Sequence, residues 1–113
     1  MVKFPKYQIK RSFNKQYYWV LHAVNGNAIL TSSEQYVAKQ DCIKSIASST
    51  RNIVDSNFNR LGASSNQYYF LQRAGNYEDL GKSEMYESSQ ARENGITAVK
   101  RDAPNANVED LTI

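Results

Sequence analysis

Few residues in this chain have the types and spacing that catalysis or metal binding requires. His22 is the only histidine and Cys42 the only cysteine, and no second ligand lies at a spacing typical of a zinc site. Glu78 and Asp79 are adjacent carboxylates, but neighbouring residues of a strand point to opposite faces, so they form a poor acid/base pair. We therefore expect no catalytic, metal-binding or cofactor-binding site, and a protein that is not an enzyme. We expect Cys42 to be buried in a helix and His22 to lie at the margin of the core.

Tyrosines near basic residues are a second chemical feature, because aromatic rings stack on bases while cations bind phosphate. The net charge is +3, and five basic residues lie in the first fifteen positions: Lys3, Lys6, Lys10, Arg11 and Lys15. This basic N-terminal edge suits a phosphate or an acidic partner, although lysines on an edge strand also guard against aggregation. The candidate interaction surface consists of Lys10, Arg11, Tyr18, His22, Tyr69 and Arg73.

A Ser-Glu-x-Tyr element occurs twice, at residues 33–36 and 83–86, where a strand is expected to lead into a helix. Two copies could form a symmetric polar site from Glu34, Tyr36, Glu84 and Tyr86. In the structural interpretation, the tyrosine covers the sheet edge while Ser or Glu accepts from free N–H groups at the helix start. We favour this structural role, because a duplicated fold repeats its joints.

The elements that would position these residues come from an internal duplication. Residues 16–20 (QYYWV) return as residues 67–71 (QYYFL), at an offset of 51. After the loss of one residue near Ser33 the offset becomes 50, and four identities then follow in order: Glu34 with Glu84, Tyr36 with Tyr86, Gln40 with Gln90, and Ile46 with Ile96. This ordered recurrence predicts two copies of one unit.

Within each copy the apolar pattern changes from alternation to a helical period. In the first copy we expect strands at residues 7–13, 16–24 and 27–32, joined by turns at residues 14–15 and 25–26. The core face of the second strand carries Tyr17, Trp19, Leu21 and Ala23. A helix is expected over about residues 37–51, and residues 52–57 form the linker. The helical stripe is expected to consist of Cys42, Ile43, Ile46 and Ile53.

The second copy repeats this plan and adds a closing element. Ser88 or Ser89 is expected to cap its helix. The apolar stripe of this helix consists of Ala91, Ile96 and Val99. The segment 102–105 contains Pro104 and ends the helix, since the residue before a proline avoids the α region. Residues 108–111 are expected to form a closing strand.

These patterns predict an α+β protein in which two tandem β-β-β-α repeats, residues 1–55 and 56–113, form one pseudo-twofold domain with an antiparallel sheet and two helices. A unit of about 50 residues buries little apolar surface alone, so the copies should share a core over residues 1–113, with Trp19 and Phe70 in equivalent buried places. A single cysteine, and no apolar run of membrane-spanning length, fit a cytoplasmic monomer that does not bind membranes.

The ordered motifs resemble the YegP-like family. They are residues 17–26 (YYWVLHAVNG), residues 29–32, Glu34, Tyr36 and Lys39, then in the second copy residues 83–86, 91–96, 99–100 and the tail 107–112. The resemblance covers nearly the whole chain and implies a β-β-β-α unit in one or two copies. It implies little about activity, because the family is mainly uncharacterised. The copies depart from the family pattern at Ser45, Tyr77 and Gln72, where the other copy has Gly95, Gly26 and Leu21.

The sequence therefore predicts a non-catalytic binding or interaction module of unknown partner, for which a protein partner is one option. The first alternative is a nucleic-acid-binding protein that uses the basic N-terminal edge and exposed tyrosines. The least supported alternative is an enzyme with an unrecognised site.

Overall fold

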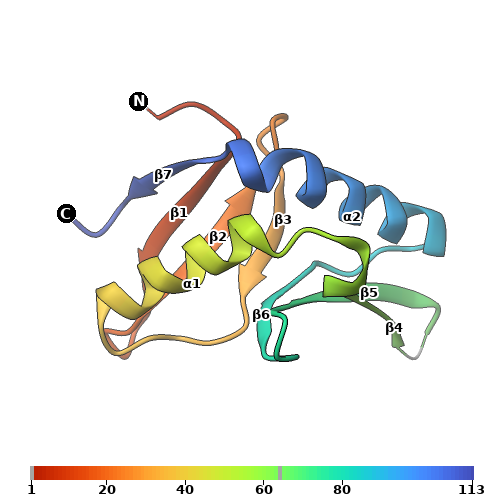
Figure 1. The fold of residues 1–113 in the computed structure, drawn as a ribbon, viewed down its shortest axis with the longest axis horizontal. Coiled ribbons are helices and arrows are strands. Elements are labelled where there is room, and N and C mark those ends of the chain that lie inside the picture. Colours follow the sequence, from red (N-terminus) through yellow and green to blue (C-terminus); the bar gives the residue numbers. More distant parts are fainter. Residues whose placement is uncertain (1, 64) are drawn as a thin grey trace.

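A computed structural model describes residues 2–63 and 65–113. Two helices, α1 (Lys39–Arg51) and α2 (Ser89–Asp102), lie on one face of a seven-stranded sheet (Figure 1). The strand order is β4-β5-β6-β3-β2-β1-β7. The strands are β1 (Lys6–Arg11), β2 (Tyr17–His22), β3 (Ala28–Ser32), β4 (Phe58–Ala63), β5 (Gln67–Arg73), β6 (Asp79–Lys82) and β7 (Asn107–Asp110).

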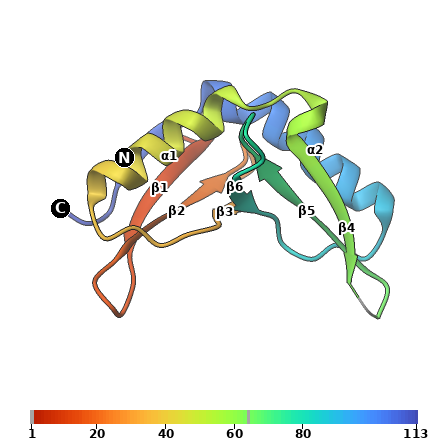
Figure 2. The same ribbon diagram turned by 60° about the horizontal axis from the view of Figure 1, so that its bottom comes forward.

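The duplication is visible at the centre of the sheet. The equivalent strands β3 and β6 pair antiparallel, with Thr31 opposite its own equivalent Lys82. A pseudo-twofold axis therefore passes between these two residues. Figure 2 shows both helices on one side of the sheet and the β1–β2 and β4–β5 hairpins extending from it as two arms. The α+β prediction with two β-β-β-α repeats is confirmed.

Strands β1 to β6 are antiparallel to their neighbours, as expected, but the closing strand β7 makes the sheet mixed. It pairs in parallel with β1, with Lys6 opposite Asn107 and Ile9 opposite Asp110. The chain reaches this position from β6 through α2 and the short 3₁₀ turn that follows it, so the two parallel strands are separated by nearly the whole chain. The last strand of the second copy thus completes the sheet of the first.

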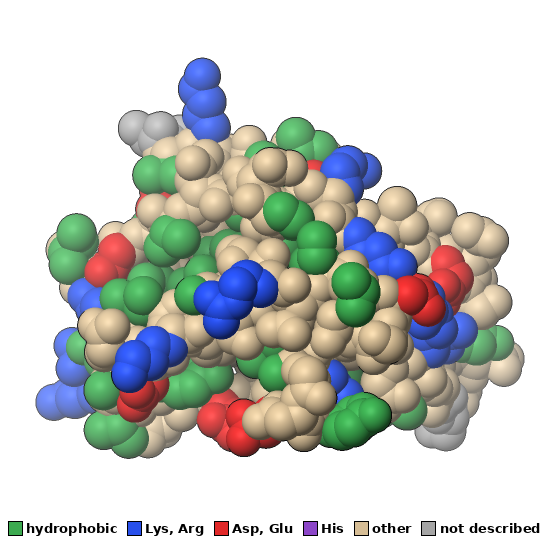
Figure 3. Space-filling view, viewed as in Figure 1, with side chains coloured by type: hydrophobic (Ala, Val, Ile, Leu, Met, Phe, Trp, Pro, Cys, Tyr) green, Lys and Arg blue, Asp and Glu red, His purple; other side chains and the backbone are tan. Residues whose placement is uncertain are grey.

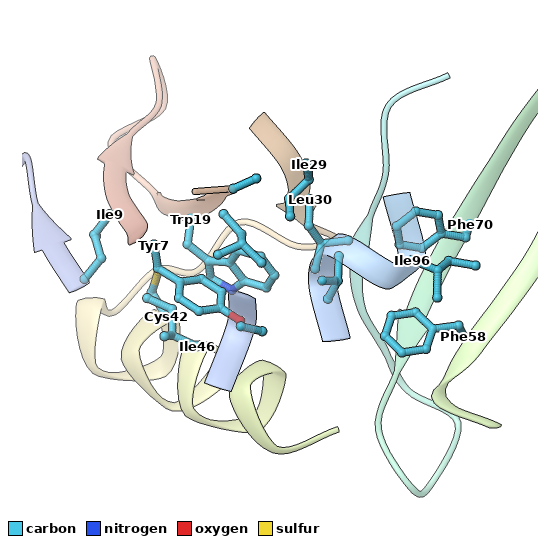
Figure 4. Close-up of a cluster of buried hydrophobic side chains, with 14 residues drawn as sticks. Tyr7, Ile9, Trp19, Ile29, Leu30, Cys42, Ile46, Phe58, Phe70 and Ile96 are labelled. Carbon is cyan, nitrogen blue, oxygen red and sulfur yellow. The ribbon is translucent and has the colours of Figure 1, made fainter. Parts of the chain in front are cut away.

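The core joins both copies in a single cluster of buried side chains. Trp19 and Phe70 are both fully buried in equivalent places, as predicted. Figure 4 shows Leu30 between a group around Trp19 and a group around Phe70. The position equivalent to Leu30 is Gly81, where an added Cβ would lie 2.7 Å from Leu30 Cγ and 3.0 Å from Trp19 Cη2. The axis therefore has room for one large side chain only.

A buried polar network also connects the copies. Gln72, which stands where the first copy has Leu21, is fully buried. Its Nε2 donates to the carbonyl oxygens of Ser49 (2.9 Å) and Asn52 (2.8 Å), and its Oε1 accepts from the Ser49 hydroxyl (2.7 Å). Tyr7 Oη lies 2.8 Å from the same Ser49 oxygen. Because each of these polar groups has a partner, the substitution of Leu by Gln is accommodated at the interface between copies.

Two details of the predicted elements are wrong. The strand expected to continue to Phe13 ends at Arg11, because the Ser12 N–H donates to Gln16 O (2.9 Å) and closes a turn that leaves Phe13 fully exposed. The predicted helical stripe is wrong at two residues: Ile43 is 41% exposed, and Ile53 lies beyond the end of α1, partly buried against the core. The buried residues of α1 are Cys42, Ser45, Ile46 and Ser49. Two of these are serines, which a search for apolar residues overlooks.

Ion pairs hold β7 against the first copy. Lys6 Nζ lies 2.9 Å from Glu109, and Lys39 Nζ at the start of α1 lies 2.8 Å from Asp110. The hydrogen bonds from Lys39 and Thr112 favour the ionised carboxylate and lower the pKa of Asp110 to about 2.

This pKa predicts how β7 responds to acid. An unfolded Asp has a pKa of about 3.9, so the contribution of Asp110 is complete above about pH 4 and is lost as the pH falls toward 2. We expect the free energy of unfolding to decrease over this range, and less steeply in Asp110→Asn. Urea unfolding followed by circular dichroism measures this. The control variant is Glu87→Gln, because Glu87 is exposed. Identical pH dependence in Asp110→Asn and the unmodified chain would contradict the prediction.

The shared core predicts that the first copy cannot stand alone. A homodimer of residues 1–56 would place a second leucine where Gly81 now meets Leu30, so we expect this fragment to be unfolded or to aggregate. The intact chain is expected to be monomeric, because its second copy already covers the shared surface. Light scattering and thermal melts of both proteins test this. A monomeric fragment with a cooperative melt would show that the copies are independent.

Candidate functional site

The face of the sheet opposite the helices, here called the open face, carries an unbroken row of side chains across all seven strands. The strand registers place one residue of each strand in line. The row consists of Glu109, Gln8, Val20, Thr31, Lys82, Leu71 and Asn59. In the middle of the row Thr31 and Lys82 lie between Val20 and Leu71, and this mixture of apolar and polar groups suits a surface that contacts a partner.

Two tyrosines flank this row at pseudo-equivalent positions, and each has a lysine beside it. Lys10 is directly opposite Tyr18 in the β1–β2 pair. Lys82 Nζ lies 5.1 Å from the centre of the Tyr69 ring. Cations at this distance are attracted by the electrons of the ring face. The two Tyr-Lys pairs therefore offer both a stacking surface and a positive charge.

The open face does not bring together all six residues of the predicted interaction surface. Lys10, Tyr18 and Tyr69 lie on it, but Arg11 follows Lys10 in the strand and points to the helical side. The Arg11 guanidinium carbon lies 5.3 Å from the centre of the Tyr17 ring. The prediction grouped Lys10 and Arg11 by charge, whereas the alternation of the strand separates them.

The other two predicted residues are engaged within their own hairpins. His22 Nδ1 lies 3.0 Å from Gly26 O, and its ring packs beside Phe4 at 5.8 Å between centroids. Among the described residues its Nε2 has no hydrogen-bond partner. The equivalent residue Arg73 forms an ion pair with Asp79 at 3.0 Å. These contacts give both residues a structural role in the hairpins.

The basic N-terminal edge is partly neutralised. Lys6 is buried and paired with Glu109, which also accepts from Gln8 Nε2 (2.9 Å). The strands contain six Lys or Arg and three Asp or Glu, and each of these three acids is in an ion pair. Among the described residues, the strand cations outside any ion pair are Lys10, Arg11 and Lys82. Sequence reasoning missed Lys82, whose place beside Tyr69 depends on the β5–β6 register.

A hollow of about 440 Å³ lies near the pseudo-twofold axis. Both central strands contribute to its lining, with Leu30 and Thr31 from β3 and Lys82 from β6, together with Leu71 of β5. By contrast, the helical side in Figure 3 shows Lys and Arg interspersed with Asp and Glu, without a large area of one charge.

The Ser-Glu-x-Tyr elements lie in two separate hollows, so they do not form one symmetric site. Glu34 and Tyr36 line a hollow of about 690 Å³ against the β5–β6 turn, and Glu84 and Tyr86 line one of about 280 Å³ against the β2–β3 turn. Each element thus faces the hairpin turn of the other copy.

Both elements have a structural role, but the details differ from the prediction. The backbone N–H and C=O of Tyr36 pair with Tyr17 at 2.7 Å, and Tyr86 pairs with Tyr68 in the same way. Each tyrosine therefore extends the sheet through its backbone, whereas the prediction concerned its ring. The predicted cap by Ser or Glu of the element is wrong. Helix α1 has no side-chain cap, and the N-cap of α2 is Ser88, which accepts from the Ala91 N–H (3.0 Å) as predicted.

The two tyrosine hydroxyls have different surroundings. Tyr36 Oη donates to Ser45 Oγ (2.9 Å), which also accepts from Trp19 Nε1 (2.9 Å). In the second copy Ser45 is replaced by Gly95, and a Cβ there would lie 2.7 Å from Tyr86 Cζ. The Tyr86 hydroxyl occupies this space and has no hydrogen-bond partner among the described residues. Burial raises the pKa of Tyr86 to about 12.

The side chain at Cys42 offers no reactive thiolate. It is fully buried as predicted, and burial followed by the charge of Asp110 raises its pKa to about 11. In residues 2–63 and 65–113, no three His, Cys, Asp or Glu side chains are grouped as metal ligands would be. None of the helices described is long and apolar enough to cross a membrane.

The Tyr36–Tyr86 comparison predicts opposite effects of the same substitution. Tyr86→Phe removes a buried hydroxyl without a partner, so we expect the free energy of unfolding to stay the same or rise by about 1 kcal/mol. Tyr36→Phe removes the hydrogen bond to Ser45, and we expect the free energy of unfolding to fall by about 1 kcal/mol. Urea unfolding of both variants provides the measurement. A larger loss in Tyr86→Phe than in Tyr36→Phe would show that the Tyr86 hydroxyl is satisfied.

Comparisons with known proteins agree with this architecture. A family model described as "Domain of unknown function (DUF1508)" matches twice, at residues 13–57 and 63–110. A UPF0339 protein of Bordetella pertussis is 41% identical over 107 residues, which cover 94% of this chain and 96% of the relative. The UPF0339 protein YegP of Escherichia coli K12 is 36% identical with the same coverage. These names state no activity, partner or ligand.

Solved structures show the same fold. The solution NMR structure of a UPF0339 protein from Shewanella oneidensis matches with a TM-score of 0.87 at 34% identity, over 94% of this chain and 90% of that one. The solution NMR structure of YegP from E. coli, titled a protein of unknown function, gives a TM-score of 0.88 at 34% identity over 98% and 96% of the two chains. The chain belongs to the UPF0339 family that includes YegP, and it contains two tandem copies of the DUF1508 unit.

Proposed function

We propose that the chain is a non-catalytic binding module, that the open face of its sheet is the binding surface, and that its partner is anionic. The observation that carries this proposal is the distribution of charge on the open face. Lys10 and Lys82 lie beside Tyr18 and Tyr69, and the acids of the strands are held in ion pairs by other residues.

The remaining chemistry of the face supports contact with a polymer rather than turnover of a small substrate. Val20 and Leu71 belong to the central row, whose charged members are Lys82 and the ion-paired Glu109. Apolar and aromatic groups provide contact area, while the lysines select for negative charge. No helix covers this face in the part of the chain that the structure describes (Figure 2).

Two anionic polymers test the proposal. Amide chemical shifts of the full chain are recorded with an oligonucleotide of twelve deoxythymidines and, separately, with a glutamate-rich peptide, both at low salt. We expect at least one polymer to shift the amides of β2, β3, β5 and β6. If neither polymer shifts them, or if the shifts are confined to the helices, the proposal is wrong.

Charge removal then tests the role of the lysines. Lys10→Gln combined with Lys82→Gln should weaken binding and, for the oligonucleotide, reduce the slope of log affinity against log salt by about 0.7 for each lysine lost. The control is Lys44→Gln with Arg51→Gln, which removes the same charge from exposed positions on α1. An equal loss of affinity in both double variants would indicate a general charge effect and no defined surface.

A further inference from the structure

The tip of the β1–β2 hairpin presents a fully exposed aromatic ring in a well-bonded turn. The Ser12 N–H donates to Gln16 O (2.9 Å) and the Lys15 N–H donates to Ser12 O (3.0 Å), with Lys15 in the left-handed region at a φ of 64°. This turn leaves the Phe13 side chain in solvent. The second copy has no aromatic residue between Leu61 and Tyr68 in its sequence, so the aromatic tip is not a requirement of the duplicated fold.

Phe13 borders a hollow that reaches the open face. The hollow has a volume of about 320 Å³ and is lined by Arg11, Ser12, Phe13, Tyr18 and Gln35. The lining therefore includes two aromatic residues and an arginine, whose guanidinium carbon lies 5.3 Å from the centre of the Tyr17 ring on the helical side. The Ser12 hydroxyl and the Gln35 amide add groups able to bond to the edge of a planar ligand.

The chain segment that forms this hairpin carries charge of one sign. Residues 1–33 contain five Lys or Arg and no Asp or Glu. Three of these basic residues, Lys10, Arg11 and Lys15, belong to the hairpin near its tip. None of the three is in an ion pair within the described chain. A polyanion would be drawn to this arm, and its charge would be met by these three side chains.

We propose that the hairpin tip is a stacking site for single-stranded nucleic acid. One nucleobase enters the hollow against Phe13 and Tyr18. The phosphates on either side of it contact Lys10 on the open face and Lys15 in the turn, and a strand that continues round the tip reaches Arg11 on the helical side. This inference rests on the proposed function of the open face, because Tyr18 and Lys10 belong to both. Stacking on aromatic rings beside cations is how sequence-tolerant single-strand binders hold bases.

Single-stranded nucleic acid fits this tip better than the other anionic partners do. A chain of carboxylates would pair with the Lys and Arg side chains but leave two aromatic faces without a planar partner. An anionic membrane would receive only one large apolar side chain from a turn whose other residues are polar, and one such contact gives weak binding. A planar base with an attached phosphate uses both the rings and the charges.

The test measures the affinity of the full chain for the fluorescently labelled twelve-deoxythymidine oligonucleotide by anisotropy at low salt. Phe13→Ala should weaken binding about 5- to 150-fold, the usual effect of removing one stacking ring. Phe13→Trp should restore it. The matched control is Tyr77→Ala. Tyr77 is another exposed aromatic residue in a hairpin turn, and its backbone is in the left-handed region. Because Phe13 is fully exposed, thermal unfolding of Phe13→Ala should match that of the unmodified chain.

The outcomes separate this inference from the proposed function. Unchanged affinity in Phe13→Ala, with loss in the Lys10→Gln and Lys82→Gln double variant, would overturn the stacking site and leave the open face as the binding surface. Binding of the glutamate-rich peptide without the oligonucleotide would overturn nucleic acid as the partner class. Phe13-dependent binding to phosphatidylserine vesicles, with none to the oligonucleotide, would assign the tip to a membrane. Failure of every anionic probe would remove both proposals.

Discussion

The structure depends on a steric constraint at its pseudo-twofold axis, where two equivalent positions compete for the same space. Leu30 fills it, and Gly81 is the residue that allows this. A symmetric duplication with leucine in both places would collide, and one with glycine in both would leave a cavity, so the two copies must differ.

Other differences between the copies are linked to their neighbours in the same way. Trp19 carries an N–H that needs an acceptor, and Ser45 provides it, whereas Phe70 needs none and its neighbour is Gly95. The space left by the missing side chain is taken by the Tyr86 ring, which stacks on Phe70 at 6.3 Å. The departures from the family pattern at Ser45 and Gln72 are thus parts of two local solutions to the same fold.

The two copies also differ at equivalent positions on strands β1 and β4, because only β1 is covered by a further strand. Ile9 on β1 is buried and lies opposite Asp110 of the covering strand β7. Its equivalent on the uncovered strand β4 is Arg60, which pairs with Asp55 (2.8 Å) and Glu93 (2.9 Å). A charged residue on the inward side of an edge strand discourages the addition of another strand. The edge at β4 is therefore protected against pairing with a further strand.

The duplication and the order of elements could be predicted from the sequence because they depend on local period and on recurrence. The alternation of β2 correctly placed Trp19 in the core. In the strand predicted at residues 7–13, alternation wrongly included Phe13, because the hydrogen bonds of a turn override apolar spacing. The candidate surface was predicted only in part, since the position of Lys82 beside Tyr69 is set by pairing between β5 and β6 and not by any single segment. The parallel pairing of β7 likewise has no local signal.

The covering of β1 by β7 has a consequence for how the protein is made. Gln8 and Glu109, which are hydrogen-bonded across these two strands, lie 101 positions apart. Ribosomes add about 5 to 20 residues per second, so the outer edge of β1 waits roughly 5 to 20 s for its neighbour during translation. Throughout that interval the nascent chain exposes a strand edge beside the uncovered Ile9, so the first strand to be synthesised is among the last to be protected from other chains.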